Sequence, residues 1–256
     1  MNETPLKVRL DEDGKLLRLR LSRPKANIVD AAMIAALRAA LGEHLSNTRL
    51  RAVLLDAEGP HFSFGASVDE HMPESCADML HQLHALIIQM VESTVPILVV
   101  VRGQCLGGGL EVAAAGHLIF AAPGSMMGQP EVKLAVFAPA ASCLLPERIG
   151  QARAEDLLFS GRSIGAEEAH RIGLVNMVAE DPEQAALAYF KEYLAPLSAS
   201  SLRFAVRAAR LTVNERITSK LAAVEKMYLD QLMASHDAVE GLTAFIAKRP
   251  AVWEDR

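Results

Sequence analysis

Residues 103–116, GQCLGGGLEVAAAG, place three consecutive glycines directly before a glutamate on an apolar, alanine-rich run. A glycine has no Cβ, so the backbone of residues 107–109 can take conformations closed to other residues, and a ligand can approach its N–H groups closely. The run that follows has helical character, and the first N–H groups of a helix have no partner inside it. The stretch therefore predicts a backbone site for an anion, or for an oxygen that becomes anionic, at a helix N-terminus.

The elements around this stretch alternate between strand and helix. Three nearly continuous apolar runs are typical of strands that are covered on both faces, and Asp30 is a suitable N-cap for the first helical run. Strands are expected at 50–57, 96–102 and 117–122, and helices at 30–45 and about 74–93. This alternation predicts parallel strands joined by crossover helices.

The two ends of the chain differ from this central part. Residues 6–10 and 15–21 alternate apolar and polar side chains on either side of the turn DEDG, which predicts a β-hairpin. After about residue 182 no strand pattern remains. Helical segments are expected at 182–197, 198–211, 215–235 and 236–249. We therefore expect an α/β core over residues 1–195 and a C-terminal helical region over residues 196–256.

Composition excludes several classes of function. Of 256 residues, 51% are hydrophobic and 22% charged, and the formal net charge is −5, which gives no general affinity for nucleic acid or for an anionic membrane. The N-terminal 15 residues lack the pattern of a signal peptide, and the most apolar run, 95–101, is too short to span a bilayer. Cys76, Cys105 and Cys143 are odd in number and far apart, which favours reduced thiols and a cytoplasmic location.

Glu111 follows the glycines directly, and Glu131 follows a Gly-Gln-Pro twenty residues later. Taken alone, Glu111 can be a solvated residue of a first helical turn and Glu131 an ordinary loop residue. Together, two carboxyl groups in partly apolar surroundings near backbone donors are what acid–base chemistry beside an enolate requires. Dinucleotide, Walker and nucleophile-elbow motifs are incomplete in this sequence, and no histidine spacing indicates a metal site.

Four short motifs, read in order, resemble the crotonase (enoyl-CoA hydratase/isomerase) superfamily. They are RPKAN at 23–27, HFSFGAS at 61–67, CLGGGLE at 105–111 and MGQPE at 127–131. Their order and spacing match that family over nearly the whole chain, as far as AFIAKRPAVW at 244–253. The resemblance implies an α/β fold, a crotonase-like spiral of ββα repeats with a C-terminal helical trimerisation region. It also implies a homotrimer or a dimer of trimers.

The same resemblance implies a site for an acyl-CoA substrate. By position in the motifs, the N–H groups of Ala66 and Gly108 would hold the carbonyl oxygen of a CoA thioester, while Glu111 and Glu131 would hold and activate water. The residues expected to bind CoA or the acyl group are Lys25, Ala26, Phe64, Ser67, Val68, Phe137, Phe245 and Lys248. For the aromatic walls, ordinary core packing is the alternative. CoA arrives as part of the substrate, so no cofactor and no metal is expected.

Several positions depart from the family pattern. Pro139 stands where a glycine-rich turn is usual, Ser67 and Asp69 replace an Asp and a basic residue, and His117 replaces an Asp. A proline has no N–H with which to hold water, so a general straight-chain hydratase is not expected. The longer stretches of sequence around these motifs resemble family members that add water across a cyclic, conjugated dienoyl-CoA by 1,4-addition. A straight-chain enoyl-CoA hydratase, a double-bond isomerase and a non-catalytic, RNA-binding scaffold remain alternatives.

Overall fold

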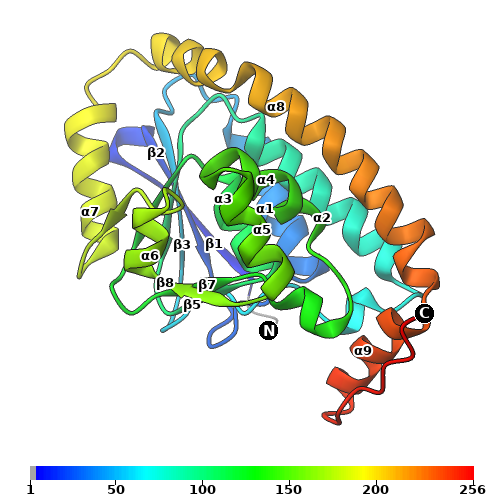
Figure 1. Ribbon diagram of the computed structural model, residues 1–256. Helices are drawn as coiled ribbons and strands as arrows, with labels where there is room; N and C mark the ends of the chain where they lie inside the picture. Colours follow the sequence, from blue (N-terminus) through cyan, green and yellow to red (C-terminus); the bar gives the residue numbers. More distant parts are fainter. Residues whose placement is uncertain (1–3) are drawn as a thin grey trace.

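A six-stranded sheet forms the centre of the computed structural model, which describes residues 4–256 (Figure 1). Its strands, in spatial order, are β1 (Leu6–Asp11), β2 (Leu16–Leu21), β3 (Ala52–Ala57), β4 (Ile97–Val101), β6 (Leu118–Ala121) and β9 (Met177–Val178). The first pair is antiparallel and the other neighbouring pairs are parallel. The predicted hairpin and the three predicted apolar strands are therefore confirmed.

A second, three-stranded sheet carries the glycine stretch. Strand β5 (Gln104–Leu106) pairs parallel with β7 (Met126–Gly128), which pairs antiparallel with β8 (Ser163–Gly165). The sequence pattern does not predict this sheet, because strands of three residues are too short to show an apolar–polar alternation. Its position matters for function, since it holds the glycines and the segment before Glu131 side by side.

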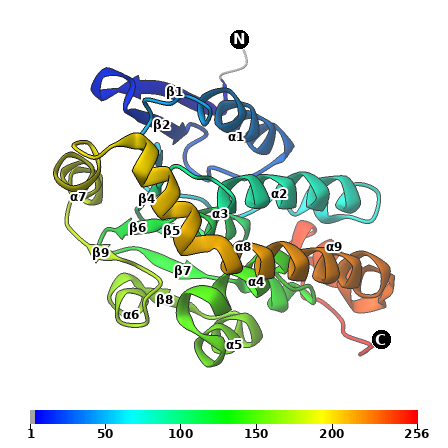
Figure 2. The ribbon, with the colours of Figure 1, turned by 90° about the horizontal axis from the view of Figure 1, so that it is seen from above.

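The large sheet has helices on both faces (Figure 2). Successive side chains of a strand point to opposite faces. Val53 and Leu55 enter the core that also contains residues of α1 (Ala31–His44), α2 (Cys76–Val91) and α3 (Gly108–Ala115). Leu54 packs instead with α7 (Pro182–Tyr189) on the other face. Asp30 caps α1, as predicted, by accepting a hydrogen bond from the Met33 N–H at 2.9 Å.

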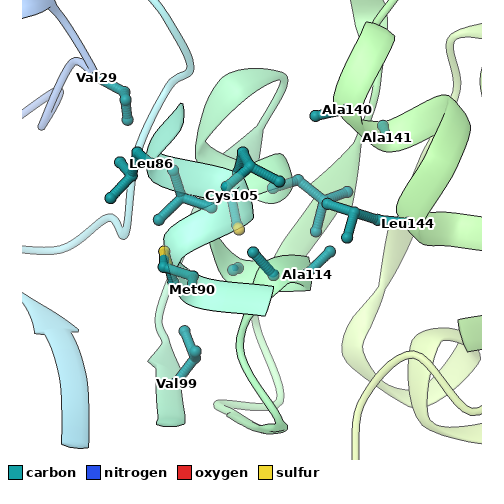
Figure 3. Close-up of a cluster of buried hydrophobic side chains, with 14 of the residues drawn as sticks. Val29, Leu86, Met90, Val99, Cys105, Ala114, Ala140, Ala141 and Leu144 are labelled. Carbon is teal, nitrogen blue, oxygen red and sulfur yellow. The ribbon is translucent and has the colours of Figure 1, made fainter. Parts of the chain in front are cut away.

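Helix α3 is enclosed by buried apolar side chains, among them Leu86, Met90 and Leu144 (Figure 3). Ala114 of α3 lies in the same cluster as Ala140 and Ala141 of α4 (Pro139–Ile149). Alanine side chains allow two helices to approach closely. As a result the N-terminus of α4 lies beside the residues that α3 presents to the site. Helices α5 (Gln151–Ser160) and α6 (Ala166–Arg171) follow along the chain.

The C-terminal part is helical, but in fewer pieces than predicted. A single long helix, α8 (Ala199–Asp230), replaces the two helices expected at 198–211 and 215–235 (Figure 1). The residues between them, Thr212, Val213 and Asn214, are weak helix formers but include no Gly or Pro to end the helix. Helix α9 (His236–Ile246) follows. The division into two domains stays a prediction. In residues 4–256 no helix has the length and hydropathy needed to cross a membrane.

Candidate active site

The pairing of β5 with β7 brings the two glutamates together. In this parallel pair Leu106 lies opposite Gly128, and the Gly107 N–H donates to the Gly128 carbonyl at 2.9 Å. The chain therefore leaves both strands at the same edge. Glu111 follows in the first turn of α3, and Glu131 follows in the 3₁₀ helix η3 (Pro130–Leu134). Both side chains line one cavity.

A further parallel bridge, between Ser63 and Cys105, adds the third segment of the site. Ala66 lies three residues after Ser63 and Gly108 three residues after Cys105, so the two backbones run together. A Cβ placed on Gly108 would lie 3.0 Å from the Ala66 nitrogen, so a side chain here would press the two backbones apart. Within residues 4–256, neither the Ala66 N–H nor the Gly108 N–H has a hydrogen-bond acceptor. Two adjacent amide donors are thus available to a ligand oxygen.

Gly107, the residue before Gly108, also has to be a glycine. Its backbone has φ of +50°, in the region that residues with a side chain rarely adopt. A Cβ at this position would also lie 2.7 Å from Oε1 of Glu131. The absence of a side chain at residue 107 therefore allows both the turn into α3 and the position of the Glu131 carboxyl group.

Glu111 is held by the N-terminus of α4. Its side chain is 3% exposed, and Oε1 accepts a hydrogen bond from the Ala141 N–H at 2.8 Å. Burial raises the pKa of Glu111, while hydrogen bonds from the backbone N–H groups of Ala141 and Ala140 act in the opposite direction. Pro139 is the first residue of α4, where an N–H has no intrahelical partner in any case. Its structural effect is therefore to start the helix whose next amides hold Glu111.

Glu131 is half-buried and has a side-chain donor. The amide nitrogen of Gln129, a residue only 1% exposed, donates to both carboxylate oxygens at 3.1 Å. Burial raises the pKa of Glu131, and the nearby charge of Glu111 raises it further. Two carboxyl groups that disfavour each other's ionisation share a proton near neutral pH. The pair can thus supply one acid and one base at the same time.

The cavity between these groups has a volume of about 350 Å³ and mainly apolar walls. The predicted residues that line it are Phe64, Ala66, Val68, Gly108, Glu111, Glu131, Phe137 and Phe245. Lys25, Ala26, Ser67 and Lys248 do not line it, and a contact of these residues with CoA stays a prediction. The Ala26 carbonyl does accept a hydrogen bond from the Phe64 N–H at 2.9 Å, and so supports the segment that leads to Ala66.

Sequence reasoning missed several residues of the cavity wall. They include His71, Leu80, Leu83, Lys133, Leu134 and Leu242. Leu80 and Leu83 are three residues apart on a predicted helix, so helical spacing places them on one face of it. The spacing does not show that this face is turned toward the glutamates. No signal in the sequence distinguishes His71 from a surface histidine. Among residues 4–256, no group of three or more His, Cys, Asp or Glu could hold a metal ion.

Comparison with known proteins agrees with this geometry. A profile of the enoyl-CoA hydratase/isomerase family matches residues 11–256. The chain belongs to this family. A solved enoyl-CoA hydratase/isomerase from Pseudoalteromonas atlantica T6c is 28% identical and superposes with a TM-score of 0.85, covering 97% of this chain and 99% of that one. The predicted crotonase-like fold is therefore confirmed.

Two relatives in this family have named activities. Cyclohexa-1,5-dienecarbonyl-CoA hydratase of Thauera aromatica is 71% identical over 253 residues, which are 99% of this chain and 98% of the relative. Carnitinyl-CoA dehydratase of Salmonella agona (strain SL483) is 30% identical over 258 residues, 96% of this chain and 98% of the relative. Both names describe the addition or removal of water on a CoA thioester.

Proposed function

We propose that this enzyme adds water to cyclohexa-1,5-diene-1-carbonyl-CoA and forms 6-hydroxycyclohex-1-ene-1-carbonyl-CoA, a step in anaerobic aromatic degradation. The observation that carries the proposal is the 71% identity, over 99% of the chain, to the Thauera hydratase of that substrate. The cavity supports it independently, because two carboxyl groups and two unpaired amide N–H groups face a mainly apolar space.

In the proposed mechanism, the thioester carbonyl oxygen accepts hydrogen bonds from the N–H groups of Ala66 and Gly108. These donors are fixed by the backbone before substrate arrives, so they need no reorganisation when the oxygen becomes negative. Loss of one donor of this type typically costs about 2.7–4 kcal/mol of transition-state stabilisation. The glycines at 107–109 are required because the oxygen must approach the backbone itself.

The glutamates divide the proton transfers between them. The amides of α4 favour the ionised form of Glu111, so we assign it as the base that takes a proton from water. The water oxygen then bonds to the ring carbon β to the thioester, and the electron pair of the double bond between this carbon and the α carbon moves to the thioester oxygen, which gives a dienolate. Glu131, whose ionisation is further opposed by the charge of Glu111, gives its proton to the far carbon of the diene. The pair again holds one proton, but on the other residue.

The walls of the cavity suit a flat, apolar ring. Phe137 and Val136 line it from the segment before α4, and Leu80 and Leu83 line it from α2. Phe137 is itself fixed, because its ring meets that of the buried Tyr228 edge-on, with centroids 5.2 Å apart. Such a wall resists rearrangement around ligands of other shapes. CoA is part of the substrate, and the reaction as proposed uses no other cofactor.

A direct test is to incubate the purified enzyme separately with the cyclic dienoyl-CoA and with crotonyl-CoA, and to detect the products by mass. We expect the cyclic ester to gain the mass of one water at a much higher kcat/KM than crotonyl-CoA. Equal or faster hydration of crotonyl-CoA would contradict the ring specificity and favour the straight-chain alternative. Movement of a double bond without a gain in mass would favour an isomerase.

We also propose that the enzyme is a cytoplasmic homotrimer or dimer of trimers. Helix α8 leaves large apolar side chains exposed, among them Phe204 at 65% and Leu211 at 62%, and exposed apolar surface of this kind marks interaction sites. The cysteines among residues 4–256 are buried and unpaired. Light scattering after gel filtration measures the assembly, and a mass of one chain would contradict it.

A further inference from the structure

His71 is a titratable residue in the cavity that the proposed mechanism does not use. It is the last residue of the 3₁₀ helix η2 (Asp69–His71), five residues after the amide donor Ala66. It lines the cavity together with Leu80 and Leu83 of α2. An imidazole among leucines is an unusual wall for an apolar ring, because its polar atoms need partners when water is excluded.

The tautomer of His71 is fixed by its own turn. Nδ1 lies 2.7 Å from the carbonyl oxygen of Ser67. A carbonyl oxygen only accepts hydrogen bonds, so Nδ1 carries the proton. Burial lowers the pKa of His71, which keeps the ring neutral at pH 7. Nε2 therefore has a free lone pair, can only accept a hydrogen bond, and has no partner within residues 4–256.

The proposed substrate offers few groups that could donate to this nitrogen. The ring carries no N–H or O–H group, and the thioester has only acceptor atoms. The oxygen that is added to the ring does carry hydrogen, first as water and then as the hydroxyl group of the product. The N–H and O–H groups of the CoA arm are the substrate's other donors, but they are common to every CoA ester.

We propose that Nε2 of His71 accepts a hydrogen bond from the oxygen that hydration adds to the ring, and that His71 thereby selects the hydroxylated ring. The inference rests on the proposed function. It makes His71 a specificity-determining residue, distinct from the two glutamates that transfer protons. Its expected signature is a preference for the alcohol over the same ring without a hydroxyl group.

Two substitutions distinguish the roles of the two ring nitrogens of His71. His71→Asn retains an amide nitrogen near the place of Nδ1, for the Ser67 carbonyl, but removes the acceptor Nε2. His71→Gln instead places an amide group near the position of Nε2. The ligands are 6-hydroxycyclohex-1-ene-1-carbonyl-CoA and cyclohex-1-ene-1-carbonyl-CoA, which differ only in the hydroxyl group. Binding of both is measured by calorimetry on the assembled wild-type enzyme and on each variant.

For His71→Asn we expect the Kd of the hydroxylated ester to rise about tenfold, the size of one lost hydrogen bond with its partner left unpaired, while the Kd of the other ester stays within about twofold. His71→Gln should recover part of the loss. Equal weakening of both esters would overturn the proposal, because it would indicate a contact with CoA or a collapsed wall. No change for either ester would overturn it as well.

His71→Leu, which fills the space without an acceptor, gives the same comparison if the Asn variant does not fold. A wild-type enzyme that does not hydrate the cyclic diene would refute the proposed function. Unchanged discrimination in variants of an active enzyme would refute only the role of His71, so the two failures are distinguishable.

Discussion

Glu111 and Glu131 line the same cavity, yet the structure holds them in different ways. Glu111 is almost fully buried on α3, and backbone amides at the start of α4 donate to it. Glu131 is half-buried on a short 3₁₀ helix, and the side chain of Gln129 donates to it. Helix α3 is enclosed by buried apolar side chains (Figure 3). The 3₁₀ helix carries exposed residues such as Val132.

The difference assigns a separate task to each carboxyl group. Backbone amides at a helix N-terminus stabilise negative charge; they hold Glu111 in position and oppose the burial that raises its pKa to about 7. Burial and the charge of Glu111 keep a proton on Glu131. In the proposed mechanism, the surroundings and not the residue type therefore determine which glutamate is the acid.

The largest effect is expected from Glu111→Gln and Glu131→Gln. Each change removes one proton transfer but keeps nearly the same shape, so we expect kcat to fall by about 10²–10⁴-fold while the Kd of the CoA ester changes little. Steady-state kinetics and calorimetry measure the two quantities. Because the two residues act as a unit, the double variant should lose little more than either single variant. Turnover that survives either substitution would remove that residue from the mechanism.

Gly107→Ala should have the next largest effect. Its Cβ would collide with Oε1 of Glu131, and its positive φ would be strained. We expect kcat to fall by about 10²–10³-fold, comparable to the loss of an oxyanion donor. Gly14→Ala is a matched control, since Gly14 also has a positive φ, +79°, but has open space around its Cβ position. Similar kinetics for the two variants would show that the clash with Glu131 is unimportant.

Gln129→Leu isolates the side-chain donor to Glu131. Glu111 has backbone donors that this substitution leaves in place, so only the acid should be displaced. We expect kcat to fall about tenfold, the value of about one lost hydrogen bond, with KM nearly unchanged. Gln89→Leu, on α2 and outside the cavity wall, is the control. A rise in KM with kcat unchanged would mean that Gln129 shapes the binding site and does not position Glu131.

The smallest effect concerns stability. The pKa of Glu131 is raised in the folded state, so its contribution to stability is complete below the unfolded pKa and is lost as pH rises through the folded pKa. Wild-type stability should therefore decline between about pH 5 and about pH 8. Glu131→Gln should melt about 2–4 °C higher than wild type at the upper pH, roughly the shift for 1 kcal/mol, and close to it at the lower pH. A constant difference in Tm would argue against a raised pKa.

Local signals in the sequence predict the elements that have long, regular patterns. Asp30 before an alanine- and leucine-rich run predicts α1 and its cap, and the alternation around DEDG predicts the first hairpin. Nothing local predicts the small sheet, because its strands are three residues long and depend on pairing partners far along the chain. The continuity of α8 is also missed, since weak helix formers lower the local signal without ending the helix.

The same limit applies to the site. The glycines at 107–109 and the two glutamates can be chosen from the sequence by their chemistry and by resemblance to the family. Their proximity cannot be derived locally, because it results from the pairing of Leu106 with Gly128 and of Ser63 with Cys105. The same holds for His71, which enters the cavity only because the turn after Ala66 packs near α2.

A crystal structure of the enzyme with cyclohex-1-ene-1-carbonyl-CoA would locate the thioester oxygen and so test the proposed mechanism most directly. We expect this oxygen within about 2.7–3.1 Å of the nitrogens of both Ala66 and Gly108, with the carboxyl groups of Glu111 and Glu131 facing the ring. A thioester oxygen bound elsewhere, or a ring that lies away from both carboxyl groups, would contradict it.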